Sequence, residues 1–168
     1  MGVRAREVGE KMAELHGTLV YVLANRYVTN AARVRALAEP ISDVQFWEKP
    51  FPYGNSFGHL VLHLTGNLNY YIGAQIARTG YVRDRPREFG DPNPPAKEEA
   101  LKRFDEAVAM VVRTIGAQSS QDWSAEYSGT GTDAKTRLDM IMQCAAHIQH
   151  HIGQMIYLGY DLQREKKA

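Results

Sequence analysis

The chain has 168 residues, a length that predicts a single domain over residues 1–168. With 44% apolar and 23% charged residues it is typical of folded soluble proteins, and a formal net charge of +1 argues against nucleic acid or an anionic membrane as a partner. One cysteine, Cys144, excludes an internal disulfide and favours a reducing cytoplasm. No stretch has the length and apolarity of a signal peptide or a membrane span, so we expect neither.

Helical spacing of apolar residues and the positions of proline and glycine predict the first two helices. The first covers residues 3–39 and ends before Pro40. Residues 41–55 contain two prolines and the aromatic residues Phe46, Trp47 and Phe51, which indicates an ordered loop packed on the rest of the protein. The second helix begins at Asn55 or Ser56, either of which is a good N-cap, and continues to about Thr79.

The second half of the chain repeats this alternation of loops and helices. Residues 81–95, rich in Arg, Asp and Pro, form a long connection, and a third helix covers residues 96–118. Residues 119–132 form another loop, and a fourth helix runs from Thr132 or Asp133 to about Leu162. No segment alternates as a strand would, so the pattern predicts an all-α, four-helix bundle with long inter-helix loops. The buried stripe of the third helix is predicted at Leu101, Phe104, Val108, Val111 and Ile115.

Two histidines of the last helix carry the main functional signal. His147 and His151 are four residues apart, which places both imidazoles on one helical face, about one turn from each other. That face is otherwise apolar, whereas His150 points about 100° away, toward a polar edge. Buried imidazoles need polar partners, and a metal ion satisfies two at once. The alternative is a pair of core histidines bonded to backbone carbonyls or water.

The second helix offers a matching histidine. His59 and His63 are also four residues apart, and either can supply a third ligand or both can complete a four-nitrogen site. His63 is favoured because it lies deeper in the helix, and Asn67, one turn further on, can orient a ring or a water or simply pack between helices. Three histidines leave a coordination position open, as in catalytic sites, and imidazole ligands suit zinc, nickel, copper or ferrous iron.

The chain resembles the DinB-like (DinB/YfiT) superfamily over almost its whole length. The resemblance is carried by HIQHHIGQ, residues 147–154, which matches the pattern H-x-x-x-H-x-G-Q, and by GHLVLHLTGN, residues 58–67. The segments WEKPFPYGNSFGHL and RDRPREF are similar to one bacterial branch. The resemblance implies that His63, His147 and His151 bind a divalent ion, usually nickel or zinc, and that the protein is a homodimer.

The resemblance implies several activities rather than one. Some relatives are thiol-dependent S-transferases, whereas others are isomerases or hydrolases. We therefore expect a metal-dependent enzyme that activates a low-molecular-weight thiol or a water for S-transfer to, or hydrolysis of, a small-molecule substrate. The alternative is a non-catalytic, stress-related, metal-binding dimer.

Three further residues keep two interpretations each, and a fourth, His150, keeps one. Arg83 and Arg85 can clamp a substrate carboxylate, or they can form salt bridges that hold the long connection on the bundle. Cys144 can be a fourth ligand or a small core residue. His150 is a candidate substrate contact, although it fills a variable position of the motif.

Overall fold

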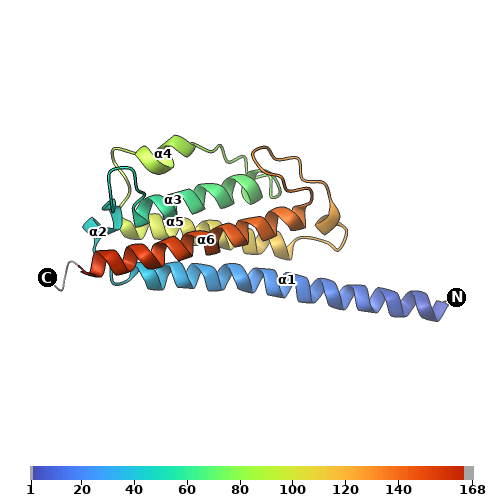
Figure 1. The fold of residues 1–168 in the computed structure, drawn as a ribbon. Coiled ribbons are helices and arrows are strands. Elements are labelled where there is room, and N and C mark those ends of the chain that lie inside the picture. The colour runs from blue at the N-terminus through green and yellow to red at the C-terminus, as the bar shows by residue number, and fades with distance from the viewer. Residues whose placement is uncertain (1, 165–168) are drawn as a thin grey trace.

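The computed structural model describes residues 2–164, and its fold is built from four long helical segments that lie side by side (Figure 1). Helix α1 (Gly2–Ala38) packs against α5 (Lys97–Gly116) and α6 (Arg137–Arg164), and α3 (Phe57–Leu68) packs against the same two helices. Residues 2–164 contain no strand, so the predicted all-α class is confirmed, and the arrangement is compatible with a four-helix bundle. No helix within this range is both long and apolar enough to cross a bilayer.

The core is formed where the four segments face one another. The stripe predicted for α5 is confirmed, because each of its five residues is at most 5% exposed. From α1, Tyr27 is fully buried, and its hydroxyl donates to the carbonyl oxygen of Ile141 on α6 at 2.6 Å. This bond and the surrounding apolar contacts fix α6, the helix of the histidine pair, against α1.

The N-terminal half of α1 extends beyond the other helices (Figure 1). Met12 and Leu15, which helped to predict this helix, are 53% and 62% exposed. The helix prediction is confirmed to within one residue at each end, but these two apolar side chains face solvent rather than the core.

The second predicted helix changes its winding partway. It is α-helical from Phe57 to Leu68 and continues as a π-helix, η1 (Asn69–Ala74). The chain leaves the helix before the predicted end at Thr79, through Arg78 and Gly80 with positive φ angles of 58° and 76°. A π-turn inserts an extra residue and is frequent at functional sites.

The predicted loops contain short helices that periodicity did not reveal. Residues 41–55 hold α2 (Asp43–Trp47), started by a capping box between Ser42 and Gln45. The next connection holds α4 (Arg85–Gly90), capped by the side chain of Asp84, and the last loop holds η2 (Asp122–Ser124). Such pieces are too short for a hydrophobic period, so capping residues are their only sequence signal.

The last helix begins later than predicted, at Arg137 rather than at Thr132 or Asp133. Glu126 and Thr136 form an isolated antiparallel bridge, and the backbone N–H of Tyr127 donates to the carbonyl oxygen of Lys135. This pairing holds residues just before Arg137 extended, so the helix starts only after them.

Candidate metal centre

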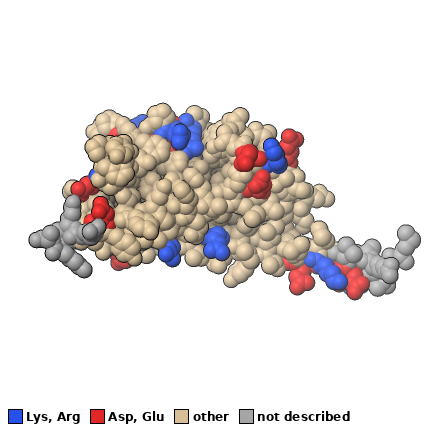
Figure 2. All heavy atoms as spheres, viewed as in Figure 1, with Lys and Arg blue, Asp and Glu red and all other residues tan. Residues whose placement is uncertain are grey.

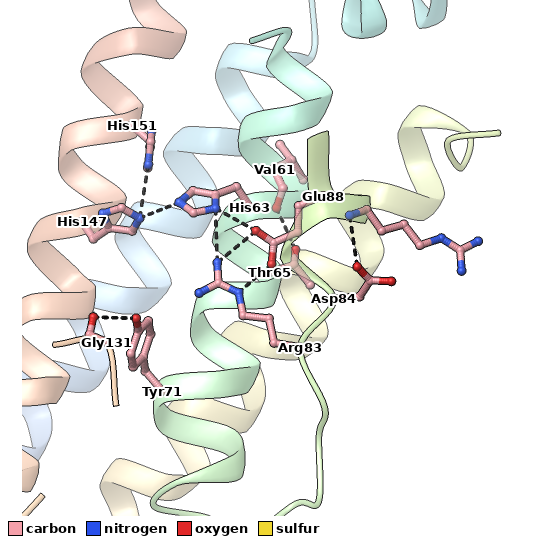
Figure 3. Close-up of polar contacts among 11 residues, drawn as sticks. Val61, His63, Thr65, Tyr71, Arg83, Asp84, Glu88, Gly131, His147 and His151 are labelled. Carbon is pink, nitrogen blue, oxygen red and sulfur yellow. Dashed lines mark hydrogen bonds and ion pairs between the residues drawn. The ribbon is translucent and has the colours of Figure 1, made fainter. Parts of the chain in front are cut away.

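Three imidazoles from two helices converge in the middle of the bundle. Figure 3 shows His63 of α3 and the pair His147 and His151 of α6 pointing toward one another. The Nε2 atom of His147 lies 3.0 Å from that of His63 and 3.2 Å from that of His151. His63 and His151 are each 8% exposed, and His147 is half-buried. The predicted inward orientation of the α6 pair is confirmed.

Two of these rings have a fixed tautomer. His63 Nδ1 lies 2.8 Å from Glu88 Oε2, and His151 Nδ1 lies 2.7 Å from Gln154 Oε1. Carboxylate and amide oxygens only accept hydrogen bonds, so Nδ1 of each ring carries the proton and donates it. The Nε2 atoms of His63 and His151 therefore present lone pairs to the centre of the cluster.

The third ring cannot satisfy both lone pairs. A neutral imidazole has one N–H, so His147 can donate from Nε2 to His63 or to His151, but not to both. A divalent ion between the three nitrogens accepts all three lone pairs at once. In a tetrahedral site with Zn–N bonds of about 2.0–2.1 Å, two nitrogens lie about 3.3 Å apart. The observed separations of 3.0 and 3.2 Å fit such a donor set.

Burial keeps the α6 pair in the form that binds metals. Burial, together with the neighbouring histidines, lowers the pKa of both His147 and His151 to about 4. Both imidazoles are therefore neutral near pH 7, and protons do not compete for their lone pairs.

Glu88 is the functional residue that the sequence did not single out. Its carboxylate accepts from His63 and from Arg83, whose Nε and Nη2 lie 2.7 and 2.9 Å from Oε1 and Oε2 (Figure 3). Although burial raises the pKa of Glu88, the bonds from His63 and Arg83 outweigh this effect and lower the pKa below its usual value. An ionised carboxylate behind a ligand histidine fixes the ring and makes it more basic.

Gly66 gives Glu88 the space to reach this position. It lies on α3, and a Cβ atom there would overlap Glu88 Oε1. Gly66, the second glycine of the motif GHLVLHLTGN, is the one sequence signal that another group approaches this face of α3 closely.

The other predicted residues have separate places. His59 lies outside the cluster, since its Nδ1 accepts from the backbone N–H of Ser56 in the capping box of α3. His150 is exposed, and the side-chain Nε2 of Gln154 lies 3.1 Å from its Nε2. Arg85 is exposed over the ring of Phe89, 5.9 Å from its centroid. Arg83 forms the salt bridge with Glu88, so its part in holding a substrate stays a prediction.

Asn67 and Cys144 line a cavity beside His147. The cavity has a volume of about 290 Å³ and also contacts Met140 and Tyr71. Cys144 is 1% exposed, and burial raises the pKa of its thiol to about 12, so it is a protonated core residue. Within residues 2–164, the three histidines are the group of His, Cys, Asp and Glu side chains that converge as a metal would require, and Cys144 is not among them.

The donor set therefore suits a divalent transition metal with three protein ligands and at least one open position. A comparison with curated proteins finds no match. The model of the DinB superfamily matches residues 26–155, which include all three histidines, Asn67 and Glu88. The match covers well over half of the chain, so the protein belongs to the DinB superfamily.

Proposed function

We propose that this protein is a metal-dependent enzyme in which His63, His147 and His151 hold a divalent ion, zinc or nickel, for S-transfer or hydrolysis of a small molecule. The observation that carries the proposal is the cluster of three Nε2 lone pairs beside a cavity. A closed structural site would have a fourth protein ligand, and the donors described here number three.

The ion supplies acidity when it is bound, because it lowers the pKa of a thiol or a water at its open position. The chain's own residues prepare the site. Glu88 and Gln154 orient the rings of His63 and His151 through their Nδ1 protons, so the donor atoms are already aimed before an ion enters. The nearby cavity of about 290 Å³ gives a small substrate room next to His147.

The proposal is tested with protein loaded with Co²⁺, whose absorption reports thiolate binding. A small thiol such as 2-mercaptoethanol should add a sulfur-to-cobalt charge-transfer band to the wild-type spectrum. His147→Ala should lose stoichiometric metal and the band, whereas His150→Ala, on the exposed face of the same helix, should keep both. If Co²⁺ binds at a 1:1 ratio but neither a thiol nor a small anion changes its spectrum, the ion has no open position and the non-catalytic alternative is correct.

The homodimer belongs to the same proposal, and α1 offers the surface for it. Met12, Leu15 and Val22 are each more than half exposed, and their spacing of three and seven residues is that of a helix-pairing stripe. In Figure 2 the middle of the face drawn has few charged side chains, whereas acidic and basic side chains stand close together on the protruding part of α1. Leu15→Glu should convert the dimer to a monomer in analytical ultracentrifugation, whereas a wild-type monomer would refute this part.

We place the enzyme in the cytoplasm, the compartment in which low-molecular-weight thiols are reduced. The support is Cys144, the one cysteine of the sequence, which is buried and free in the structure.

A further inference from the structure

One buried polar atom in the described chain lacks a partner, and it lies beside the metal centre. Asn67 is 8% exposed, and among the side chains that the structure describes its Oδ1 is the one fully buried oxygen or nitrogen that makes no hydrogen bond. Leaving such an acceptor unsatisfied destabilises a protein, because the group loses its hydrogen bonds to water and gains none in return. Asn67 lines the cavity next to His147, and a half-turn of its amide group, which exchanges Oδ1 with Nδ2, would present this oxygen to a ligand there.

The walls of this cavity are held by hydrogen bonds. The π-helix η1 brings Tyr71 to the cavity, where its hydroxyl donates to the carbonyl oxygen of Gly131 at 3.0 Å (Figure 3). Gly131 has φ +79°, and a Cβ there would lie 3.1 Å from the Tyr71 hydroxyl. The side chain of Thr132 bonds to Gln143 of α6 at 3.0 Å. The loop is therefore fixed over the cavity on two sides.

Asn67 is also placed correctly relative to the ion's ligands. It follows His63 by four residues on α3, so the two side chains lie on one face, about 5–6 Å apart at Cβ. His147 contributes both to the donor set and to the wall of the cavity. The cavity therefore adjoins the donor set, through His147, and the side chain of Asn67.

We propose that the cavity between Asn67, Tyr71, Cys144 and His147 is the substrate subsite, and that Asn67 Oδ1 accepts a hydrogen bond from the substrate. The inference rests on the proposed function. The substrate class is a small molecule that has a metal-binding atom and, within two or three bonds of it, an N–H or O–H donor. Analogues without the donor leave Asn67 buried and unsatisfied, so the site discriminates against them.

Two hydroxamates form a matched pair of probes. Acetohydroxamate binds divalent ions through two oxygens and keeps one N–H, and N-methylacetohydroxamate binds in the same way without that donor. Their affinities for the Zn²⁺-loaded protein are measured by isothermal titration calorimetry. We divide the affinity for acetohydroxamate by that for N-methylacetohydroxamate. This ratio should be about ten times higher in wild type than in Asn67→Leu, where the acceptor is gone.

The control is Asn69→Leu, the same substitution two residues further along, where the side chain lines a different cavity. Asn69→Leu should leave the ratio of the two hydroxamate affinities at the wild-type value. Asn67→Asp, which keeps an accepting oxygen, should do the same, and it replaces Asn67→Leu as the test if that variant does not fold. An equal ratio in wild type and Asn67→Leu, with both probes binding, overturns the role of Asn67 and leaves the proposed function intact. If neither probe binds the Zn²⁺-loaded wild type, the ion has no open position, and both proposals fail.

Discussion

Replacing Glu88 by glutamine tests whether its carboxylate strengthens the metal site through His63. In wild type, Oε2 accepts from His63 at 2.8 Å and from Arg83 at 2.9 Å, while Oε1 accepts from Arg83 Nε at 2.7 Å. A glutamine amide can place its single oxygen at only one of these positions, so its NH₂ group meets an N–H donor at the other. The variant therefore loses the charge and one acceptor at a site where Glu88 is 7% exposed.

Loss of a group that orients a ligand weakens metal binding by about 10–100-fold. We expect about tenfold for Glu88→Gln, or about 1.4 kcal/mol, since one accepting oxygen remains. For Glu88→Ala we expect about 100-fold, together with destabilisation of the metal-free protein by about 3 kcal/mol, because Arg83 is left with a buried, unpaired charge. Zn²⁺ affinity is measured by competition with a chromophoric chelator, and folding by circular dichroism.

Glu106→Gln is the matched control. Glu106 and Glu88 both line the second cavity, the one that Asn69 lines, but the Glu106 side chain is 65% exposed and its nearest cation, Lys102, is 4.0 Å away. This variant should bind Zn²⁺ as wild type does. Wild-type affinity in Glu88→Gln would refute the reasoning, because the carboxylate would then have no effect on the ligand that it contacts.

Three further predictions concern the same site. Gly66→Ala should weaken Zn²⁺ binding about tenfold and destabilise the protein by about 1–3 kcal/mol, because its methyl group displaces Glu88. Gly153→Ala on α6, with no neighbour within 4 Å, should instead stabilise it by about 0.5–1 kcal/mol in denaturant titrations; equal effects would contradict the steric argument. Protein that has free ion at 100 times Kd should melt about 5–10 °C higher than the same protein after a chelator has removed the ion. His147→Ala should show no such difference. Acid should destabilise the metal-free protein between pH 6.5 and 4: burial lowers the pKa of His147 and His151 to about 4, so the unfolded chain, which titrates near 6.5, binds more protons in this window. After allowance for solvent screening the loss is about 1 kcal/mol for each histidine, and urea unfolding at pH 7 and 5 that gives equal free energies would exclude it.

The long helices and the histidine pair could be predicted from the sequence because both depend on local spacing. Apolar residues every three or four positions specify a helix wherever it packs, and His147 and His151 share a face whatever lies opposite. The spacing could not separate His59 from His63, which are also four apart. The capping box of α3 separates them, since His59 stands three residues after Ser56 and its ring is occupied by the backbone there.

The contacts of Glu88 could not be predicted, because they depend on how the chain returns to the bundle. Glu88 is 25 residues from His63 and lies on a helix of only six residues. Neither periodicity nor charge pattern links two such positions. The exposure of Met12 and Leu15 has a similar origin, since helical spacing predicts an apolar face but not what covers it.

The placement of Glu88 on α4 divides the metal site between two parts of unequal stability. The three nitrogen donors belong to helices α3 and α6 of the bundle, whereas the carboxylate behind them belongs to a short helix within the connection between η1 and α5. Local opening of such a segment requires less free energy than global unfolding. Because linkage is reciprocal, an ion that binds more tightly with Glu88 in place must also hold that segment closed. The amide protons of α4 should therefore exchange more slowly with deuterium when the ion is bound. The segment between η1 and α5, which lies at the protein surface, would then differ in its dynamics between the metal-bound and metal-free protein.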